Sequence, residues 1–311
     1  MASASRLIVL DSVMIDVLVK VTELPARGSD SLASDAMITT GGGFTVATAA
    51  HRHGLDSVYG GRLGTGPLSD LARAALRREE VATPVDADPE RDAGFCLVLV
   101  DGEGERTFVT AKGAELDLTR RDLDAVAVTE GDYVYVSGYN LVYPEIGDTV
   151  VQWLGELDAG VVVALDPGAR VADIPIELVD SVLRRCDWLL CNNVEARTLS
   201  GASDVEAAAD ALLARTGGEG VVIHDGERGC WVVTPTQPCV RVAGFPARVV
   251  DTNGAGDTHN GVLLAELAKG TPVLEAARRA NGASAVAIGR LGPATSPTHD
   301  ELTAWFARFA G

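Results

Sequence analysis

The segment Arg248-Val-Val-Asp-Thr-Asn-Gly-Ala-Gly-Asp-Thr-His-Asn-Gly261 decides the fold, because it places a glycine-rich turn directly before an Ala/Leu-rich helix. Residues 248–250 read as the end of a strand, and the helix is expected over about 257–268. Small residues at 254–256 allow a tight turn, for which a positive φ is expected at Gly256, and they expose N–H groups where anions bind.

A carboxylate follows this turn at once, at Asp257. Backbone N–H groups stabilise charge on a transferring phosphoryl group, and a neighbouring carboxylate can take the proton of an attacking hydroxyl. The combination is the one that a hydroxyl kinase needs. The alternative is that Asp251 and Asp257 only cap a turn and a helix, although the Asp-x-x-Gly-Ala-Gly-Asp string is longer than a cap requires.

Short apolar runs alternate with helical patterns of about ten to fifteen residues through the second half of the chain. They lie at 133–137, 161–165, 188–191 and 221–224. This alternation predicts right-handed βαβ units and a parallel sheet. Capping boxes are expected at Ser203-x-x-Glu206 and Thr298-x-x-Glu301, each at the start of a helix.

The first half of the chain interrupts this alternation with additional strands. The residue pattern predicts a first buried strand over 6–10, helices over 44–53 and 68–78, and a hairpin formed by 94–100 and 106–110. The simplest architecture is one α/β domain over 1–311. A small β-sheet is inserted in its N-terminal half by strands within about 12–40 and 92–112.

Composition excludes several classes of function. A net charge of −18 argues against binding to nucleic acid or to an anionic membrane. None of the three lysines stands in a Gly-Lys-Ser/Thr context, so there is no P-loop, and no Gly-x-Gly-x-x-Gly occurs. The five cysteines include no Cys-x-x-Cys, and the apolar run at 7–10 is too short for a signal peptide. A cytoplasmic protein with reduced thiols is expected.

The glycine-rich segment resembles the C-terminal signature of the ribokinase-like (PfkB) carbohydrate kinases, Asp-Thr-x-Gly-Ala-Gly-Asp. The resemblance implies that the backbone of Gly254, Ala255 and Gly256 forms an anion hole and that Asp257 is the catalytic base. It also implies a ribokinase-like fold, in which helices flank a central, mostly parallel sheet and a small β-sheet acts as a lid. The implied reaction is ATP-dependent phosphorylation of a hydroxyl on a sugar or a sugar-like molecule.

Further segments carry the resemblance into the nucleotide site. Asn192-Asn-Val-Glu195 matches the family's Asn-x-x-Glu motif, which implies that Glu195 helps to place Mg²⁺, through water; the alternative is an ordinary helix start. His224-Asp-Gly226-x-x-Gly229 lies where the family has a Thr-x-Gly-x-x-Gly nucleotide loop. The resemblance also assigns three other residues: Asn281 to the nucleotide site, and Asp251 and Asn253 to a monovalent cation such as K⁺.

The acceptor site is implied by the N-terminal half. Gly41-Gly42-Gly43-Phe-Thr45 resembles the family's first signature, although Thr45 replaces the usual Asn. Asp16 stands where the family has an Asp that binds acceptor hydroxyls, and Asp11 replaces a usual Gly. The resemblance implies that these glycines, Thr45 and Asp16 contact a sugar or nucleoside, and that two copies of the chain form a homodimer through the lid.

Three other functions remain open on the sequence. One is a nucleoside kinase of the same fold. Another is a sugar- or nucleotide-binding regulator without turnover. The residues Thr45, Asp11 and His224, which differ from the family's usual ones, favour this alternative. The third is a dehydrogenase or reductase with an unusual nucleotide loop.

Overall fold

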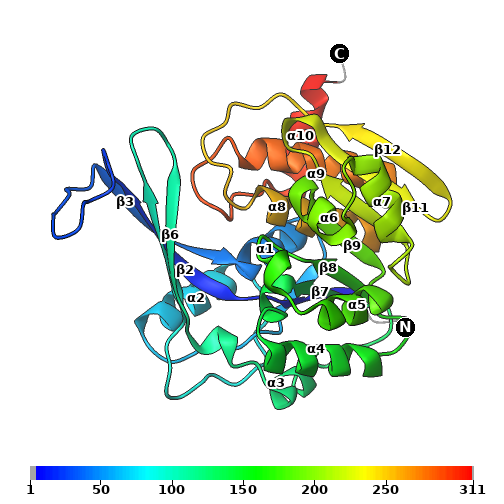
Figure 1. Cartoon of the computed structure of the whole chain (residues 1–311), viewed down its shortest axis with the longest axis horizontal. Helices are drawn as coiled ribbons and strands as arrows, with labels where there is room; N and C mark the ends of the chain where they lie inside the picture. Colours follow the sequence, from blue (N-terminus) through cyan, green and yellow to red (C-terminus); the bar gives the residue numbers. More distant parts are fainter. Residues whose placement is uncertain (1–4, 310–311) are drawn as a thin grey trace.

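The computed structural model describes residues 5–309, and most of its strands form one large sheet (Figure 1). The sheet has the strand order β12-β11-β10-β9-β8-β7-β1-β4. The six strands from β10 to β4 run parallel, and β11 and β12 are antiparallel additions at one edge. The bounds are β1 (Arg6–Leu10), β4 (Asp56–Tyr59), β7 (Tyr133–Ser137), β8 (Val162–Asp166), β9 (Trp188–Asn192), β10 (Gly220–His224), β11 (Gly229–Thr234) and β12 (Gln237–Ala243).

Helices cover both faces of this sheet, as alternation along β1 requires. Leu7 and Val9 belong to one core cluster and Ile8 and Leu10 to the other, and all four are fully buried. The first face is covered by α1 (Gly43–Arg52), α2 (Pro67–Arg78), α8 (Ala255–Ala268), α9 (Val273–Ala287) and α10 (His299–Phe306). The second face is covered by α3 (Arg120–Asp124), α4 (Pro144–Glu156), α5 (Ile176–Arg185), α6 (Asn193–Ser200) and α7 (Val205–Leu213).

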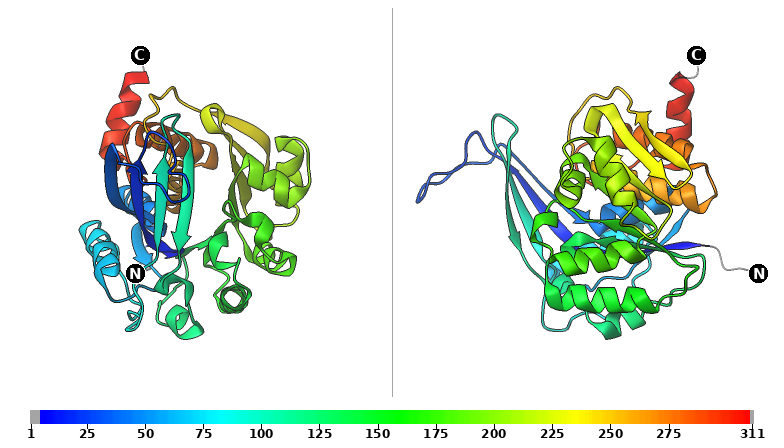
Figure 2. Two further views of the ribbon diagram at one scale, coloured as in Figure 1. Left: turned by 60° about the vertical axis from the view of Figure 1, so that its left-hand side comes forward. Right: turned by 45° about the vertical axis from the view of Figure 1, so that its right-hand side comes forward.

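Four further strands form a separate small sheet that stands out from the body of the molecule (Figure 2). They are β2 (Val13–Lys20), β3 (Asp35–Gly42), β5 (Phe95–Val100) and β6 (Arg106–Ala111), in the order β3-β2-β5-β6. Short 3-10 helices lie at Ala114–Leu116, Gly138–Asn140, Val171–Asp173, Gly226–Arg228 and Ala307–Phe309. Within residues 5–309, none of the helices is long and apolar enough to cross a bilayer.

Most of the predicted elements are confirmed, and two are wrong. Residues 248–250 form no strand: β12 ends at Ala243, and Val249 and Val250 are 61% and 51% exposed in the loop that follows. The box predicted from Ser203 is also wrong, because the next residue caps α7: the carboxylate of Asp204 accepts the N–H of Ala207 at 2.9 Å. The capping box at Thr298 and Glu301 is confirmed.

A buried ionic cluster joins four helices of the first face. The carboxylate of Glu266 on α8 accepts Lys269 Nζ at 3.1 Å and lies 3.3 Å from Arg279 Nε on α9. His53 after α1 and His299 on α10 place their Nδ1 atoms 3.9 and 3.8 Å from the same oxygen. The histidines and the carboxylate are metal-ligand types, but Lys269 and Arg279 already neutralise Glu266, so we interpret the cluster as structural.

This cluster predicts an acid-sensitive contribution to stability. Burial raises the pKa of Glu266, but the neighbouring His53 imidazole, the hydrogen bond from Lys269 and the charge of Arg279 outweigh it and hold the pKa well below its usual range. A depressed pKa stabilises the fold above the unfolded-state pKa of about 4.3, and that contribution is lost as the pH falls below it. Glu266→Gln should therefore cost about 3 kcal/mol of unfolding free energy at pH 7.

Urea unfolding of both proteins between pH 7 and pH 3 measures this difference, which should shrink below about pH 4.3. Glu275→Gln is the matched control, because Glu275 forms a half-exposed ion pair with Arg278 on α9. Such pairs contribute about 0–1 kcal/mol. A difference between wild type and Glu266→Gln that stays constant down to pH 3 would contradict the assignment.

Candidate active site

The start of α8 has the geometry of an anion cradle. Gly254 precedes the helix in the left-handed region, with φ of 74°, and a Cβ there would overlap the carbonyl of Pro293. The positive φ that the sequence placed at Gly256 thus belongs to Gly254. A Cβ at Gly256 would meet only the His224 ring, at an ordinary 3.6 Å. The first turn of a helix has no intrahelical acceptors for its N–H groups, so they can face an anion.

Asp257 lies in this first turn among other carboxylates. Its side chain is partly buried, and burial raises its pKa well above the usual range. The charges that act on it most strongly are four more carboxylates, Asp166, Asp11, Asp16 and Glu195. The resemblance assigned two of these carboxylates, Asp16 and Glu195, to the site, and in the structure both act on Asp257. A carboxyl with a raised pKa is a stronger base when it is ionised.

Asp166 is a residue that sequence reasoning missed. It ends β8, and its Oδ2 accepts Tyr135 OH at 3.1 Å and Asn260 Nδ2 at 2.7 Å. Burial raises its pKa to about 6. The available signal was its place at the carboxyl end of a parallel strand, directly before Pro-Gly, since ligands bind at that edge of an open sheet. Asn260, three residues after Asp257, ties α8 to this carboxylate.

Glu195 and Asn192 form a reciprocal capping box at the start of α6. Asn192 Oδ1 accepts the N–H groups of Val194 and Glu195, each at 2.9 Å. The Glu195 carboxylate accepts Asn192 N at 2.8 Å and Asn192 Nδ2 at 2.6 Å. Burial and the charge of Asp166 raise the pKa of Glu195 to about 7. The helix-start role is therefore real, and it holds the carboxylate beside Asp166.

Two histidines meet beneath the cradle. His224 at the end of β10 and His259 on α8 have ring centroids 4.5 Å apart, and burial lowers the pKa of both, that of His224 to about 4. His259 Nε2 lies 3.2 Å from Asn281 Oδ1, and Asn281 Nδ2 donates to Val242 O at 3.1 Å. The Asn281 amide is thus fully used inside the protein. His224 Nε2 and His259 Nδ1 have no hydrogen-bond partner among residues 5–309.

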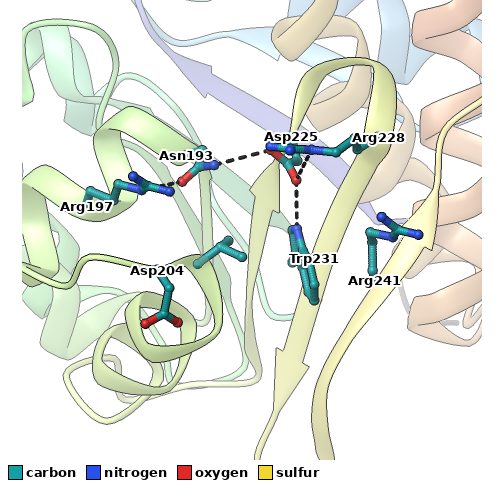
Figure 3. A pocket seen from close by; sticks show the side chains of 8 residues that line it. Asn193, Arg197, Asp204, Asp225, Arg228, Trp231 and Arg241 are labelled. Atoms are coloured by element: carbon teal, nitrogen blue, oxygen red, sulfur yellow. Dashed lines mark hydrogen bonds and ion pairs between the residues drawn. The ribbon is translucent and has the colours of Figure 1, made fainter.

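The loop after β10 is held by Asp225, as Figure 3 shows. Its carboxylate accepts Arg228 Nη2 at 2.6 Å, Trp231 Nε1 at 2.9 Å and Asn193 Nδ2 at 3.2 Å. These contacts flank a cavity of about 240 Å³ between α6 and β11. Gly226 and Gly229 have φ of 58° and 95°, so the loop needs glycine at both positions. The loop predicted for the nucleotide is therefore rigidly tied to the Asn192 segment.

The residues predicted to bind the acceptor lie where the small sheet meets the body. Gly41 approaches Asp16 so closely that a Cβ would overlap Asp16 Oδ2, and a Cβ at Gly43 would lie 2.9 Å from Asp11 Cβ. Burial raises the pKa of Asp16 to about 6 and that of Asp11 to about 7. Gly42 has a φ of 64°, and the N–H of the next residue, Gly43, donates to Ser12 O at 2.9 Å. Thr45 is fully buried in α1, so its hydroxyl does not face open space.

The loop before the cradle carries Asp251 and Asn253. Asp251 is buried, and its Oδ1 accepts Asn253 N at 2.9 Å while its Oδ2 accepts Gly292 N at 3.1 Å. The Asn253 side chain lies near Asp16 of the small sheet and acts to lower the pKa of that carboxyl. Asp251 and Asn253 thus link the loop before the cradle to the turn at Gly292 and to Asp16 of the small sheet.

One relative and two solved structures show which known proteins this chain is similar to. An uncharacterised sugar kinase of Escherichia coli, YegV, is 30% identical over 308 residues, which cover 97% of this chain and 94% of that protein. The solved E. coli putative ribokinase II in complex with ATP and Mg²⁺ has a TM-score of 0.84 at 19% identity, covering 98% of this chain and 99% of its own. Arabidopsis thaliana ribokinase, solved with ribose and ATP, has a TM-score of 0.79 at 21% identity, covering 97% and 98%.

The family model described as pfkB family carbohydrate kinase matches residues 4–300. That span contains both sheets, the cradle at Gly254 and the carboxylates around Asp257. The chain belongs to the PfkB family of carbohydrate kinases.

Proposed function

We propose that this protein transfers the γ-phosphoryl group of ATP to a hydroxyl of a sugar or sugar-like molecule, with Asp257 as the base. The observation that carries the proposal is the position of Asp257, in the first helical turn after the Gly254–Gly256 cradle. There its carboxylate can take the proton of the acceptor hydroxyl while N–H groups of the same turn stabilise charge on the phosphoryl oxygens. Such a transfer depends on positioning and charge more than on covalent help.

The proposed ligands follow from the two sides of the site. Asp16 and the turn of Gly41, Gly42 and Gly43 would hold the acceptor, with the small sheet acting as a lid. His224, Gly226, Gly229 and Asn281 would shape the nucleotide site; because its amide is engaged, Asn281 would act by orienting His259. Asp166 and Glu195 fit Mg²⁺, which prefers a few carboxylates and water and would neutralise the phosphates. We keep a monovalent cation at Asp251 and Asn253 in the proposal as a competitor of Arg106, whose guanidinium pairs with Asp251 in this structure.

Assembly and location belong to the same proposal. We infer a homodimer through the small sheet, because its edge strand β6 exposes Phe108 and Val109 at 57% and 56%, on opposite faces of the strand. A nucleoside acceptor is the second candidate, since the same site would hold a ribose. We infer a cytoplasmic location, where ATP is available; the cysteines of the described chain are all free thiols.

The base assignment predicts the effect of Asp257→Asn. Turnover should fall by on the order of 10² or more, the usual contribution of a positioned base. Because a raised pKa means that the ionised carboxylate destabilises the fold at pH 7, the melting temperature should stay level or rise. ADP release over a panel of sugars and nucleosides measures the first effect and thermal unfolding the second. Asp148→Asn, an exposed site on α4, is the control; near-normal turnover in Asp257→Asn would refute the assignment.

The cradle predicts a separation of fold from activity at two neighbouring glycines. Gly256→Val should fold normally, since a Cβ there meets only the His224 ring at an ordinary distance, yet it should lose phosphoryl transfer by on the order of 10². Gly254→Val should lower the melting temperature, because its φ and Pro293 exclude a side chain. Gly155→Val on α4, where a Cβ meets nothing within 4 Å, is the control for both. Full activity in Gly256→Val would mean that the segment is only a turn.

The magnesium proposal predicts a shift in metal requirement. Glu195→Gln should raise the Mg²⁺ concentration needed for half-maximal rate at fixed ATP more than it changes the Michaelis constant for the acceptor. Glu301→Gln is the matched control, because Glu301 closes the same type of capping box with Thr298 at the far helix α10. Glu301→Gln should lose a little stability, because the pKa of Glu301 is lowered, whereas Glu195→Gln should lose less or none, because the pKa of Glu195 is raised to about 7. Identical magnesium titrations in the two would leave Glu195 only the capping role.

A further inference from the structure

One arginine of the small sheet reaches across to the loop that precedes the cradle. Arg106 begins β6, and its Nη2 donates to Asp251 Oδ1 at 2.5 Å, while Nη1 lies 3.5 Å from Thr252 Oγ1. The two partners are 145 residues apart in sequence. The Asp251 side chain is only 2% exposed and that of Arg106 28%. The contact is therefore an ion pair with one buried and one accessible member.

Two further contacts bring the small sheet to the same place. Asn253, two residues beyond Asp251, lies close enough to the Asp16 carboxylate on β2 to act on its pKa. Met37 on β3 lies beside the turn at Gly292, where a Cβ would be 3.4 Å from Met37 Cε. Figure 1 shows the small sheet along one side of the body, facing the loops that surround α8. Three strands thus meet the loops that shape the cradle.

The buried charge of Asp251 makes its ion pair with Arg106 more than a surface contact. Asp251 accepts two backbone N–H groups, from Asn253 and Gly292, and within residues 5–309 Arg106 is its one ion-pair partner. A buried carboxylate that loses its counter-charge is strongly disfavoured. The loop carrying Asp251 therefore favours the position of the small sheet in which Arg106 is present.

We propose that Arg106 is a positioning residue that acts as a latch: its ion pair with Asp251 holds the small sheet closed over the acceptor. This inference rests on the proposed kinase function. Closing the sheet sets Asp16 and Asp257 on either side of the acceptor, which brings the attacking hydroxyl to the cradle and excludes water. Opening for exchange of ligands leaves the buried Asp251 carboxylate without its counter-charge, so the closed position is the favoured one.

The experiment compares Arg106→Ala and Arg106→Lys with wild type. Arg106→Ala should raise the Michaelis constant for the acceptor about tenfold or more, lower the turnover number, and raise the fraction of ADP released without phosphorylated acceptor, because water enters an open site. Arg106→Lys keeps the charge but not the planar fork, so it should fall between the two. Asp251→Asn should add little to Arg106→Ala, since both remove one interaction.

Arg91→Ala is the matched control. Arg91 also forms a close ion pair, with Asp117, but both side chains are exposed at 58% and 37%, and the pair lies outside the cradle loops. Its kinetic constants should equal those of wild type. If Arg106→Ala changes only the melting temperature, with the Michaelis constant and the uncoupled ADP release as in wild type, the latch is refuted.

A second measurement separates the latch from the proposed reaction. Hydrogen–deuterium exchange of peptides covering 95–111 reports opening of the small sheet without any turnover. Arg106→Ala should exchange several-fold faster there than wild type and Arg91→Ala. If no acceptor gives ADP release with wild type, the proposed function fails while this readout still decides the latch. Unchanged exchange in Arg106→Ala overturns the latch even when the kinase reaction is established.

Discussion

Repulsion among carboxylates is the constraint on which the site depends. Asp11, Asp16, Asp166, Glu195 and Asp257 influence one another at the carboxyl edge of the sheet, and burial adds to the cost of ionising them. A cluster of this kind is stable only if it binds protons or cations. In the proposed reaction, the backbone dipoles at the start of α8 and a divalent cation would be the positive partners of this cluster. The chain has a net charge of −18, so the rest of the protein supplies little positive charge to offset this carboxylate cluster.

The rest of the fold keeps this cluster in place. Neighbouring parallel strands end at Asp166 and Asn192, so their order in the sheet sets the separation of Asp166 and Glu195. Helix α8 is buried over most of its length, which fixes Asp257 and lets Asn260 hold Asp166. Gly261 makes this burial possible, because the backbone of α1 at Val46 lies where a Cβ would stand. Buried contacts thus hold the site on the side of the body, and the proposed latch assigns any opening to the small sheet.

The sequence predicted the strands and the carboxylate after the cradle because these are local features. The run from Tyr133 to Ser137 and the string from Gly254 to Asp257 each contain their own pattern. The prediction of a strand at 248–250 was wrong because the β-branched residues there favour a strand, yet no neighbouring strand pairs with them. Asp166 and Asn260 were missed because their importance comes from a contact between residues 94 positions apart. Which of several small residues takes the left-handed conformation likewise depends on Pro293, far along the chain.

The histidine pair beneath the cradle has a consequence for how this chain can vary. The rings of His224 and His259 lie 4.5 Å apart, centroid to centroid, and both side chains are buried. Replacing either one alone leaves the other imidazole in a buried space shaped for two rings, with one ring nitrogen already unpartnered. Substitutions at the two positions are therefore expected to be coupled: a change at one should be tolerated better when the other changes with it.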